Sequence, residues 1–117
     1  MKTTALKKNN QILIPRVQIA QKFFERFFGL MGRKNINEQD TIVFPNCNSI
    51  HTFFMSEKID VIFVSATGVV TNIFYSLKPW KLLLPQKKAV HCIEMASESS
   101  RVLGISEGDS LSCEGVF

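Results

Sequence analysis

The most informative segment of this sequence is His51-Thr-Phe-Phe-Met-Ser-Glu-Lys-Ile-Asp-Val-Ile-Phe-Val64. Its second half, from Ile59 to Ser65, is rich in β-branched and aromatic residues and is predicted to be a buried strand. Asp60 within that run and His51 at the start of the stretch are polar, and a buried strand tolerates such groups only when they are hydrogen-bonded. The stretch therefore predicts a central strand together with a polar network or binding site attached to it.

Short apolar segments on both sides of this stretch are predicted to be further strands, because they are bounded by turn-forming residues. They are residues 12–14 and 17–19, which form one strand broken or bent at Pro15, and residues 41–44, 50–55, 69–75, 79–84, 89–95 and 110–113. Turns rather than long helical crossovers connect these segments, so we expect a mainly antiparallel sheet.

Two helices are also expected. Between residues 21 and 31, apolar side chains recur at helical spacing, namely Phe23, Phe24, Phe27, Phe28 and Met31. A short helix is expected over residues 97–103, with Ser97 as its N-cap and Gly104 just after its end.

The predicted fold class is therefore mainly β (α+β): a small, mostly antiparallel, barrel-like sheet with one Phe-rich helix that plugs one opening and one short C-terminal helix. Residues 1–10 are polar and are expected to form a flexible N-terminal tail. Residues 11–117 are expected to be a single β-rich domain, because a chain of 117 residues is the usual size of one domain.

Charge and cysteine content restrict the function classes. The formal net charge is +4 and the basic residues are spread along the chain, whereas nucleic-acid-binding domains usually cluster their charge on one face. Cys47, Cys92 and Cys113 form no CxxC pair, which favours a reducing compartment. Since no signal peptide and no membrane-spanning apolar run is apparent, we expect a cytoplasmic protein without membrane insertion. The spread of the basic residues makes nucleic acid the less favoured partner.

Cys47 and His51 are the closest pair of potential metal ligands in the sequence. Zinc needs three or four ligands, and His91 and Cys92 point to opposite faces of their strand, so the two cannot complete one site. Cys47 and His51 are also too far apart on a straight strand to form a nucleophile–base pair. We therefore predict no metal, no other cofactor and no catalytic residue, and keep a metal site at Cys47 and His51 only as an alternative.

Several motifs together indicate a known family. They are Gly29-Leu-Met-Gly-Arg33, His51-Thr-Phe-Phe-Met55 followed by Ile59-Asp-Val-Ile-Phe63, Pro79-Trp80, and Gly104-Ile-Ser-Glu-Gly-Asp109. With these motifs, the chain resembles the family known as domain of unknown function 192, which is widespread in bacteria and archaea. The resemblance implies a compact, β-rich domain of barrel-like character with short helices, and it implies no established enzyme activity. We expect a bacterial source.

Arg33, His51, Asp60 and Trp80 are the polar or amphipathic side chains within this otherwise apolar signature. Our hypothesis is that they line one concave end of the barrel and hold a ligand or an extended segment of another protein. A structural interpretation is equally simple, with Asp60 paired to Arg33 or His51 as a partly buried acid that fixes the register.

The function expected from the sequence is that of a non-enzymatic binding or accessory module that engages a protein partner. Trp80 lies between Lys78 and Lys81 and is expected to be a surface residue of the kind that forms binding hot spots. One alternative is a small ligand- or metal-binding enzyme that uses a pocket at His51 and Asp60. A second alternative is a weak nucleic-acid binder. The sequence predicts neither the identity of the partner nor the oligomeric state.

Overall fold

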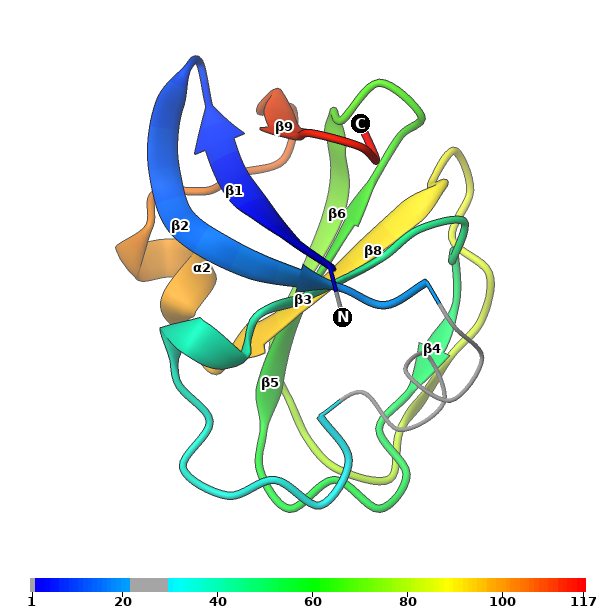
Figure 1. The fold of residues 1–117 in the computed structure, drawn as a ribbon. Helices are drawn as coiled ribbons and strands as arrows, with labels where there is room; N and C mark the ends of the chain where they lie inside the picture. The colour runs from blue at the N-terminus through cyan, green and yellow to red at the C-terminus, as the bar shows by residue number, and fades with distance from the viewer. Residues whose placement is uncertain (1, 22–29) are drawn as a thin grey trace.

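The computed structural model describes residues 2–21 and 30–117. Their regular secondary structure consists mainly of strands (Figure 1). The strands are β1 (Lys2–Lys8), β2 (Gln11–Ile19), β3 (Ile42–Phe44), β4 (Ile50–His51), β5 (Ile59–Val64), β6 (Val70–Leu77), β7 (Leu82–Leu83), β8 (His91–Ala96) and β9 (Leu111–Cys113). Two short helical segments accompany them, the 3-10 helix η1 (Glu38–Asp40) and the α-helix α2 (Ser99–Val102).

Seven of the strands form one sheet in the order β6-β5-β8-β3-β2-β1-β9, and β4 and β7 form a separate two-stranded sheet. The pairing is antiparallel except between β2 and β3, which run parallel. The mainly β, mainly antiparallel architecture is thus confirmed. The predicted barrel is not confirmed, because β6 and β9 stand at the two ends of the strand order and do not pair as neighbouring strands. The segments beside them are joined locally, by an isolated bridge between Val69 and Ser110 and by backbone hydrogen bonds such as that from the Val70 N–H to the Asp109 carbonyl, at 2.8 Å.

β5 is the central strand predicted from the sequence, and all of its residues are buried. Ile62 and Val64 belong to one hydrophobic cluster, whereas Val61 and Phe63 belong to another. Alternate residues of a strand point to opposite faces of the sheet. The main sheet therefore has a core on each face, which explains why this stretch is continuously apolar rather than alternating.

The N-terminal tail predicted for residues 1–10 is wrong for residues 2–8, which form β1. This strand pairs with β2 on one side and with β9 on the other. Leu6 is fully buried and anchors it in the first core. The polar residues around Leu6 are compatible with a strand because its half-exposed face needs no apolar side chains.

Other predicted elements differ in length or continuity. β2 continues through Pro15 as one strand, but its pairing with β1 shifts register between Ile14 and Val17, which agrees with the predicted bend. The proline is tolerated because β3 pairs only with Gln18 and Ile19 and leaves the edge beside Pro15 open. The strands predicted over residues 50–55 and 79–84 shorten to β4 and β7. The C-terminal helix begins after Glu98, not after Ser97. Most of the predicted Phe-rich helix, residues 22–29, lies outside the described residues.

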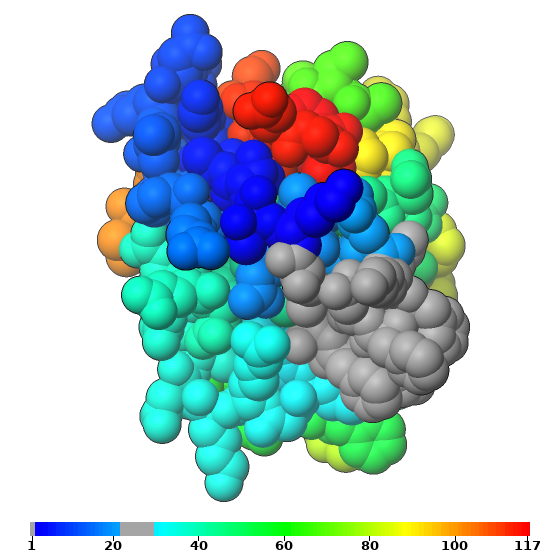
Figure 2. Space-filling model, in the orientation of Figure 1, coloured from blue at the N-terminus to red at the C-terminus, as the bar shows by residue number. Residues whose placement is uncertain are grey.

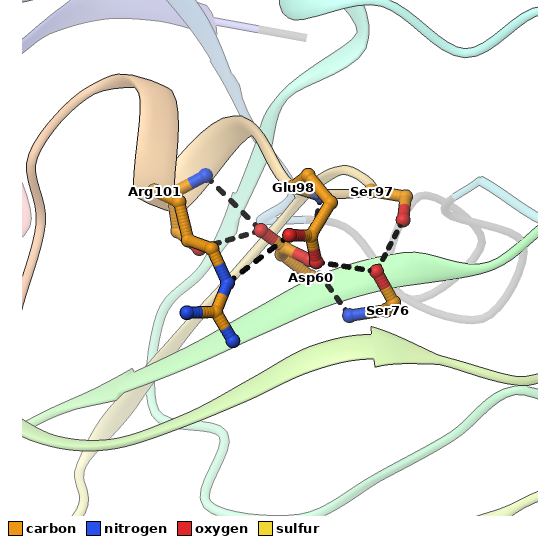
Figure 3. Close-up of polar contacts among 6 residues, drawn as sticks. Asp60, Ser76, Ser97, Glu98 and Arg101 are labelled. Atoms are coloured by element: carbon orange, nitrogen blue, oxygen red, sulfur yellow. Dashed lines mark hydrogen bonds and ion pairs between the residues drawn. The ribbon is translucent and has the colours of Figure 1, made fainter.

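The packing of α2 against the sheet depends on the buried carboxylate of Asp60 (Figure 3). Its Oδ1 accepts hydrogen bonds from the backbone N–H of Ser76, at 2.8 Å, and of Glu98, at 2.9 Å. Its Oδ2 accepts from the backbone N–H and the hydroxyl of Ser100, at 3.0 and 2.5 Å. Ser76 and Glu98 have positive φ angles of 47° and 67°, and the hydrogen bonds to Asp60 hold these unfavourable conformations in place.

An outer layer of polar contacts extends the Asp60 network to the surface (Figure 3). The Ser76 hydroxyl lies 2.6 Å from that of Ser97 and donates to Glu98 at 2.6 Å. Arg101 pairs with Glu98 at 3.0 Å and lies over the ring of Tyr75. These groups are exposed and add little stability compared with the buried carboxylate.

Replacing Asp60 with alanine is expected to lower the free energy of unfolding by about 3–5 kcal/mol, because several buried donors lose their acceptor at once. Ser97→Ala is the matched control; it removes an exposed member of the same network and should change stability by less than about 1 kcal/mol. Urea unfolding of the two variants measures the difference. Equal, small losses for both would contradict the anchoring role of Asp60.

Glu94 of β8 is a buried acid on the face of the sheet opposite to that of Asp60. It pairs with Val61 of β5 and Ile42 of β3, and its side chain lies on the same face as Cys92. Among residues 2–21 and 30–117, no hydrogen bond or ion pair to its carboxyl group is formed. Burial raises the pKa of Glu94 from 4.5 to about 8.

The raised pKa of Glu94 predicts that stability falls as the pH rises. Between pH 4.5 and about 8, the folded state keeps a proton on Glu94 that the unfolded state has lost. The contribution of this bound proton to the free energy of unfolding is complete below pH 4.5 and lost above pH 8. Its size is on the order of 5 kcal/mol. Glu94→Gln, which cannot ionise, should therefore be much less sensitive to pH when unfolding is measured at pH 5 and pH 8.5.

Burial lowers the pKa of His91, which by itself would make the protein more stable as the pH rises. His91 is present in both proteins, so the difference between wild type and Glu94→Gln isolates the glutamate. The same pH dependence in both would show that Glu94 titrates normally in the folded state.

Candidate functional site

Thr52 fastens the segment after β4 to the segment before β7. Its side chain is fully buried. The hydroxyl donates to the carbonyl of Lys78, at 2.7 Å, and accepts from the backbone N–H of Lys81, at 2.9 Å. Its own N–H donates to the Lys81 carbonyl, at 2.8 Å, and its carbonyl accepts from the N–H of Trp80, at 3.0 Å. These bonds fix the backbone on which the neighbouring aromatic residues are carried.

Aromatic rings from the two fastened segments contact one another at the surface. Phe54 meets Trp80 edge to face with ring centroids 4.7 Å apart, and Phe53 stacks on Trp80 at 5.9 Å. Phe54 and Trp80 are each 61% exposed. Their φ angles are positive, 64° and 65°, a conformation that is costly for bulky residues. The backbone thus holds two large rings out in solvent at a cost in conformational energy.

Two leucines extend this apolar surface along β7. Leu82 is 60% exposed and Leu84 is 69% exposed, whereas Leu83 between them packs against the second core. The alternation follows from strand geometry, which places Leu82 and Leu84 on the same side. We call the residues Phe53, Phe54, Trp80, Leu82 and Leu84 the aromatic surface.

The segment that carries this surface is strongly basic. Residues 78–88 contain Lys78, Lys81, Lys87 and Lys88 and no acidic residue. All four lysines are exposed, and within the part of the chain that the structure describes none of them makes an ion pair. The aromatic surface therefore has uncompensated positive charge beside it.

The structure brings together two of the residues that the sequence singled out. His51 stacks on Phe53 at 4.8 Å, and Phe53 contacts Trp80. The His51 Nδ1 accepts a hydrogen bond from the Phe53 N–H at 3.2 Å. His51 therefore supports one side of the aromatic surface and Trp80 forms its exposed part.

Arg33 lies near the aromatic surface, but its side chain serves another contact. The N–H of Gly32 donates to the carbonyl of Phe54 at 3.1 Å, which places the two segments side by side. The Arg33 guanidinium pairs with Asp40 at 3.1 Å and helps to hold η1. The predicted pairing of Arg33 with Asp60 is thus wrong.

Asp60 is not part of this surface, so the hypothesis that all four residues line one concave end is wrong. Its carboxylate shares a face of β5 with Ile62 and Val64, whereas β4 and β7 pack against the core on the other face. Figure 1 shows α2, which Asp60 anchors, on the side of the molecule away from β4. The side chains of His51 and Asp60 therefore do not converge on one pocket.

The alternative metal site also finds no support in the geometry. The Cys47 thiol donates to the carbonyl of Ser49 at 3.0 Å, and His51 is engaged with Phe53. No cluster of three or more His, Cys, Asp or Glu side chains suitable for a metal occurs in residues 2–21 and 30–117. Within the same residues, no helix is long and apolar enough to cross a membrane.

A separate hollow of about 740 Å³ lies between β2 and η1, lined by residues that include Arg16, Gln18 and Glu38. The Gln18 Oε1 is buried and accepts no hydrogen bond from any of the residues that the structure describes. In the space-filling view, the N-terminal strands and the segment after residue 30 form neighbouring parts of one face of the molecule (Figure 2). The four candidate site residues predicted from the sequence, Arg33, His51, Asp60 and Trp80, are not among the residues that line this hollow.

Sequence reasoning missed Phe54, Leu82, Leu84 and Thr52. The exposure of Phe54 accompanies a positive φ angle, and no feature of the sequence around Phe54 indicates that conformation. The useful signal was the run of lysines around Pro79-Trp80, because a strand flanked by prolines and lysines is typical of an exposed edge.

Comparisons with known proteins agree with this fold. The UPF0127 protein of Thermococcus kodakarensis is 40% identical over 101 residues, which cover 83% of this chain and 64% of that protein. The UPF0127 protein of Pyrococcus abyssi is 34% identical over 102 residues, covering 82% of this chain and 84% of that protein. The chain thus spans a little under two thirds of the Thermococcus kodakarensis relative. Both relatives are archaeal, so the expected bacterial source is not confirmed.

Two solved structures share the fold. A protein of unknown function from Novosphingobium aromaticivorans has a TM-score of 0.77 at 22% identity and covers 94% of this chain and 83% of its own. A protein from Sinorhizobium meliloti, proposed to be a transcription regulator, has a TM-score of 0.74 at 20% identity and covers 86% of this chain and 83% of its own. At these identities the likeness concerns the fold alone.

The family model for DUF192, described as an uncharacterised ACR, matches residues 4–113. This range includes most of β1, the aromatic surface and Asp60. Together with the UPF0127 relatives, the match confirms the resemblance noted in the sequence. The chain belongs to the DUF192 family.

Proposed function

We propose that this protein is a non-enzymatic binding module whose aromatic surface holds a protein partner. One observation carries the proposal: Phe54, Trp80, Leu82 and Leu84 are all at least 60% exposed and lie on two segments fastened to each other by Thr52. Isolated apolar side chains on a surface need no explanation, but adjoining ones mark interaction sites.

The conformation of the rings supports the same function. Phe54 and Trp80 hold left-handed backbone conformations that cost about 1–3 kcal/mol each, yet their side chains remain largely in water. Tryptophan contributes heavily to binding when a partner buries it, because it loses a large apolar area and few rotamers. Strain at exposed aromatic residues is typical of a site that is arranged in advance of binding.

The two alternatives have weaker support. An enzyme at His51 and Asp60 would need the two side chains in one pocket, and they lie on opposite faces of β5. Nucleic acids do bind lysines interleaved with aromatic rings, and the Sinorhizobium meliloti structure is proposed to be a transcription regulator. However, two leucines as exposed as the tryptophan favour an apolar partner over stacked bases.

Substitution of both rings should abolish partner binding without unfolding the protein. Phe54→Asn and Trp80→Asn keep a residue that tolerates positive φ and remove the apolar side chain. The dissociation constant for the partner purified from the protein's own cell extract should rise at least about 30-fold, as expected for a loss of 2 kcal/mol or more. The unfolding midpoint should not fall, because both side chains are exposed and asparagine tolerates the positive φ angles better than the rings do.

Val102→Asn is the matched control, since Val102 is 86% exposed on α2, outside the aromatic surface. It should bind the partner as tightly as the wild type. Undiminished binding by the double variant, or a partner that is captured only through nuclease-sensitive nucleic acid, would contradict the proposed function.

A further inference from the structure

β7 has an edge that no strand covers within the described residues. It pairs with β4 on one side, with Ile50 opposite Leu83 and His51 opposite Leu82, and the order of the small sheet ends there. An uncovered edge offers backbone donors and acceptors to any extended chain beside it.

The register shows which groups point outward. The N–H of Thr52 donates to Lys81, so the backbone of Lys81 faces β4. In an antiparallel pair, successive residues alternate between facing the partner strand and facing away. The backbone of Leu83 therefore faces β4, and the N–H and C=O of Leu82 and the N–H of Leu84 face the open side. The Leu84 carbonyl accepts a hydrogen bond from the Gln86 side chain at 2.6 Å.

Prolines limit this edge at both ends. Pro79 and Pro85 lack a backbone N–H and confine pairing to the residues between them. A short edge bounded by prolines and lysines resists unselective aggregation. It still accepts a partner whose side chains match its own, because the exposed Leu82 and Leu84 would flank the added strand.

The charge of the segment identifies the partner's chemistry. Residues 78–88 contain four lysines, at positions 78, 81, 87 and 88, and no acidic residue. This segment alone therefore carries a charge of +4, which equals the formal net charge of the whole chain. We propose that the partner presents an extended, acidic segment that adds as a third strand along the open edge of β7, with its apolar side chains on the aromatic surface and its carboxylates near these lysines. This inference rests on the proposed function and specifies the partner.

Trp80 allows the inference to be tested directly, because it is the chain's single tryptophan and lies within the proposed site. The probe is a short, capped peptide of alternating Glu and Leu, titrated into the full chain while Trp80 emission is followed. We expect saturable binding that weakens as salt is added. The same peptide with alternate backbone nitrogens methylated cannot complete the ladder and should bind at least about tenfold more weakly.

Charge reversal provides the matched variants. Lys78→Glu with Lys81→Glu should weaken binding of the Glu-Leu peptide at least about tenfold and favour a Lys-Leu peptide. Lys2→Glu with Arg16→Glu changes the net charge equally, at exposed positions of β1 and β2, and should leave binding unchanged.

The outcomes separate this inference from the proposed function. Equal binding of the methylated and unmethylated peptides would overturn strand addition while leaving the aromatic surface as a binding site. Binding of a single-stranded oligothymidylate or of vesicles containing phosphatidylglycerol, without binding of the Glu-Leu peptide, would overturn the inference in favour of a nucleic acid or a membrane surface. If binding of the natural partner depends on Phe54 and Trp80 but no acidic peptide binds, the inference of an acidic segment is wrong and the proposed function still stands.

Discussion

The buried carboxylate of Asp60 fixes how the end of the chain lies against the main sheet. It sits on the central strand, where removal from water would be costly for an unpaired charge, and it accepts hydrogen bonds from three backbone N–H groups and one hydroxyl. These donors come from the end of β6 and from the start of α2. One side chain therefore connects three parts of the chain that are far apart in sequence.

Thr52 plays the corresponding part on the other face of the sheet. Like Asp60, it is a polar residue without exposed surface, and its bonds go to the backbone of a distant segment, residues 78–81. Buried polar groups of this kind give a loop one conformation, because breaking any of the bonds leaves a group unsatisfied. The aromatic surface depends on that constraint, since its tryptophan lies within the fastened segment.

The sequence predicted β5 well because a strand buried on both faces needs a continuous apolar run, and few other structures need one. β1 was not predicted as a strand, because Leu6 is its one buried residue and a single apolar residue gives no strand pattern. Its pairing with β9, near the other end of the chain, is also not visible in the local sequence. That Asp60 needed partners was predictable. Their identity was not, because three of the four donors are backbone N–H groups, and two of these belong to left-handed residues, Ser76 and Glu98. Trp80 was correctly expected at the surface, whereas Phe54 was not.

Left-handed residues occur at both polar anchors, but their consequences differ. At Ser76 and Glu98, the strained backbone points its N–H groups at Asp60, so buried hydrogen bonds offset the strain. At Phe54 and Trp80, backbone bonds hold the conformation, yet the rings gain little burial in return. A fold optimised for stability alone would turn such rings inward or replace them with glycine or asparagine. The proposed binding function would account for these exposed rings, because a partner would bury the apolar area that folding leaves in water.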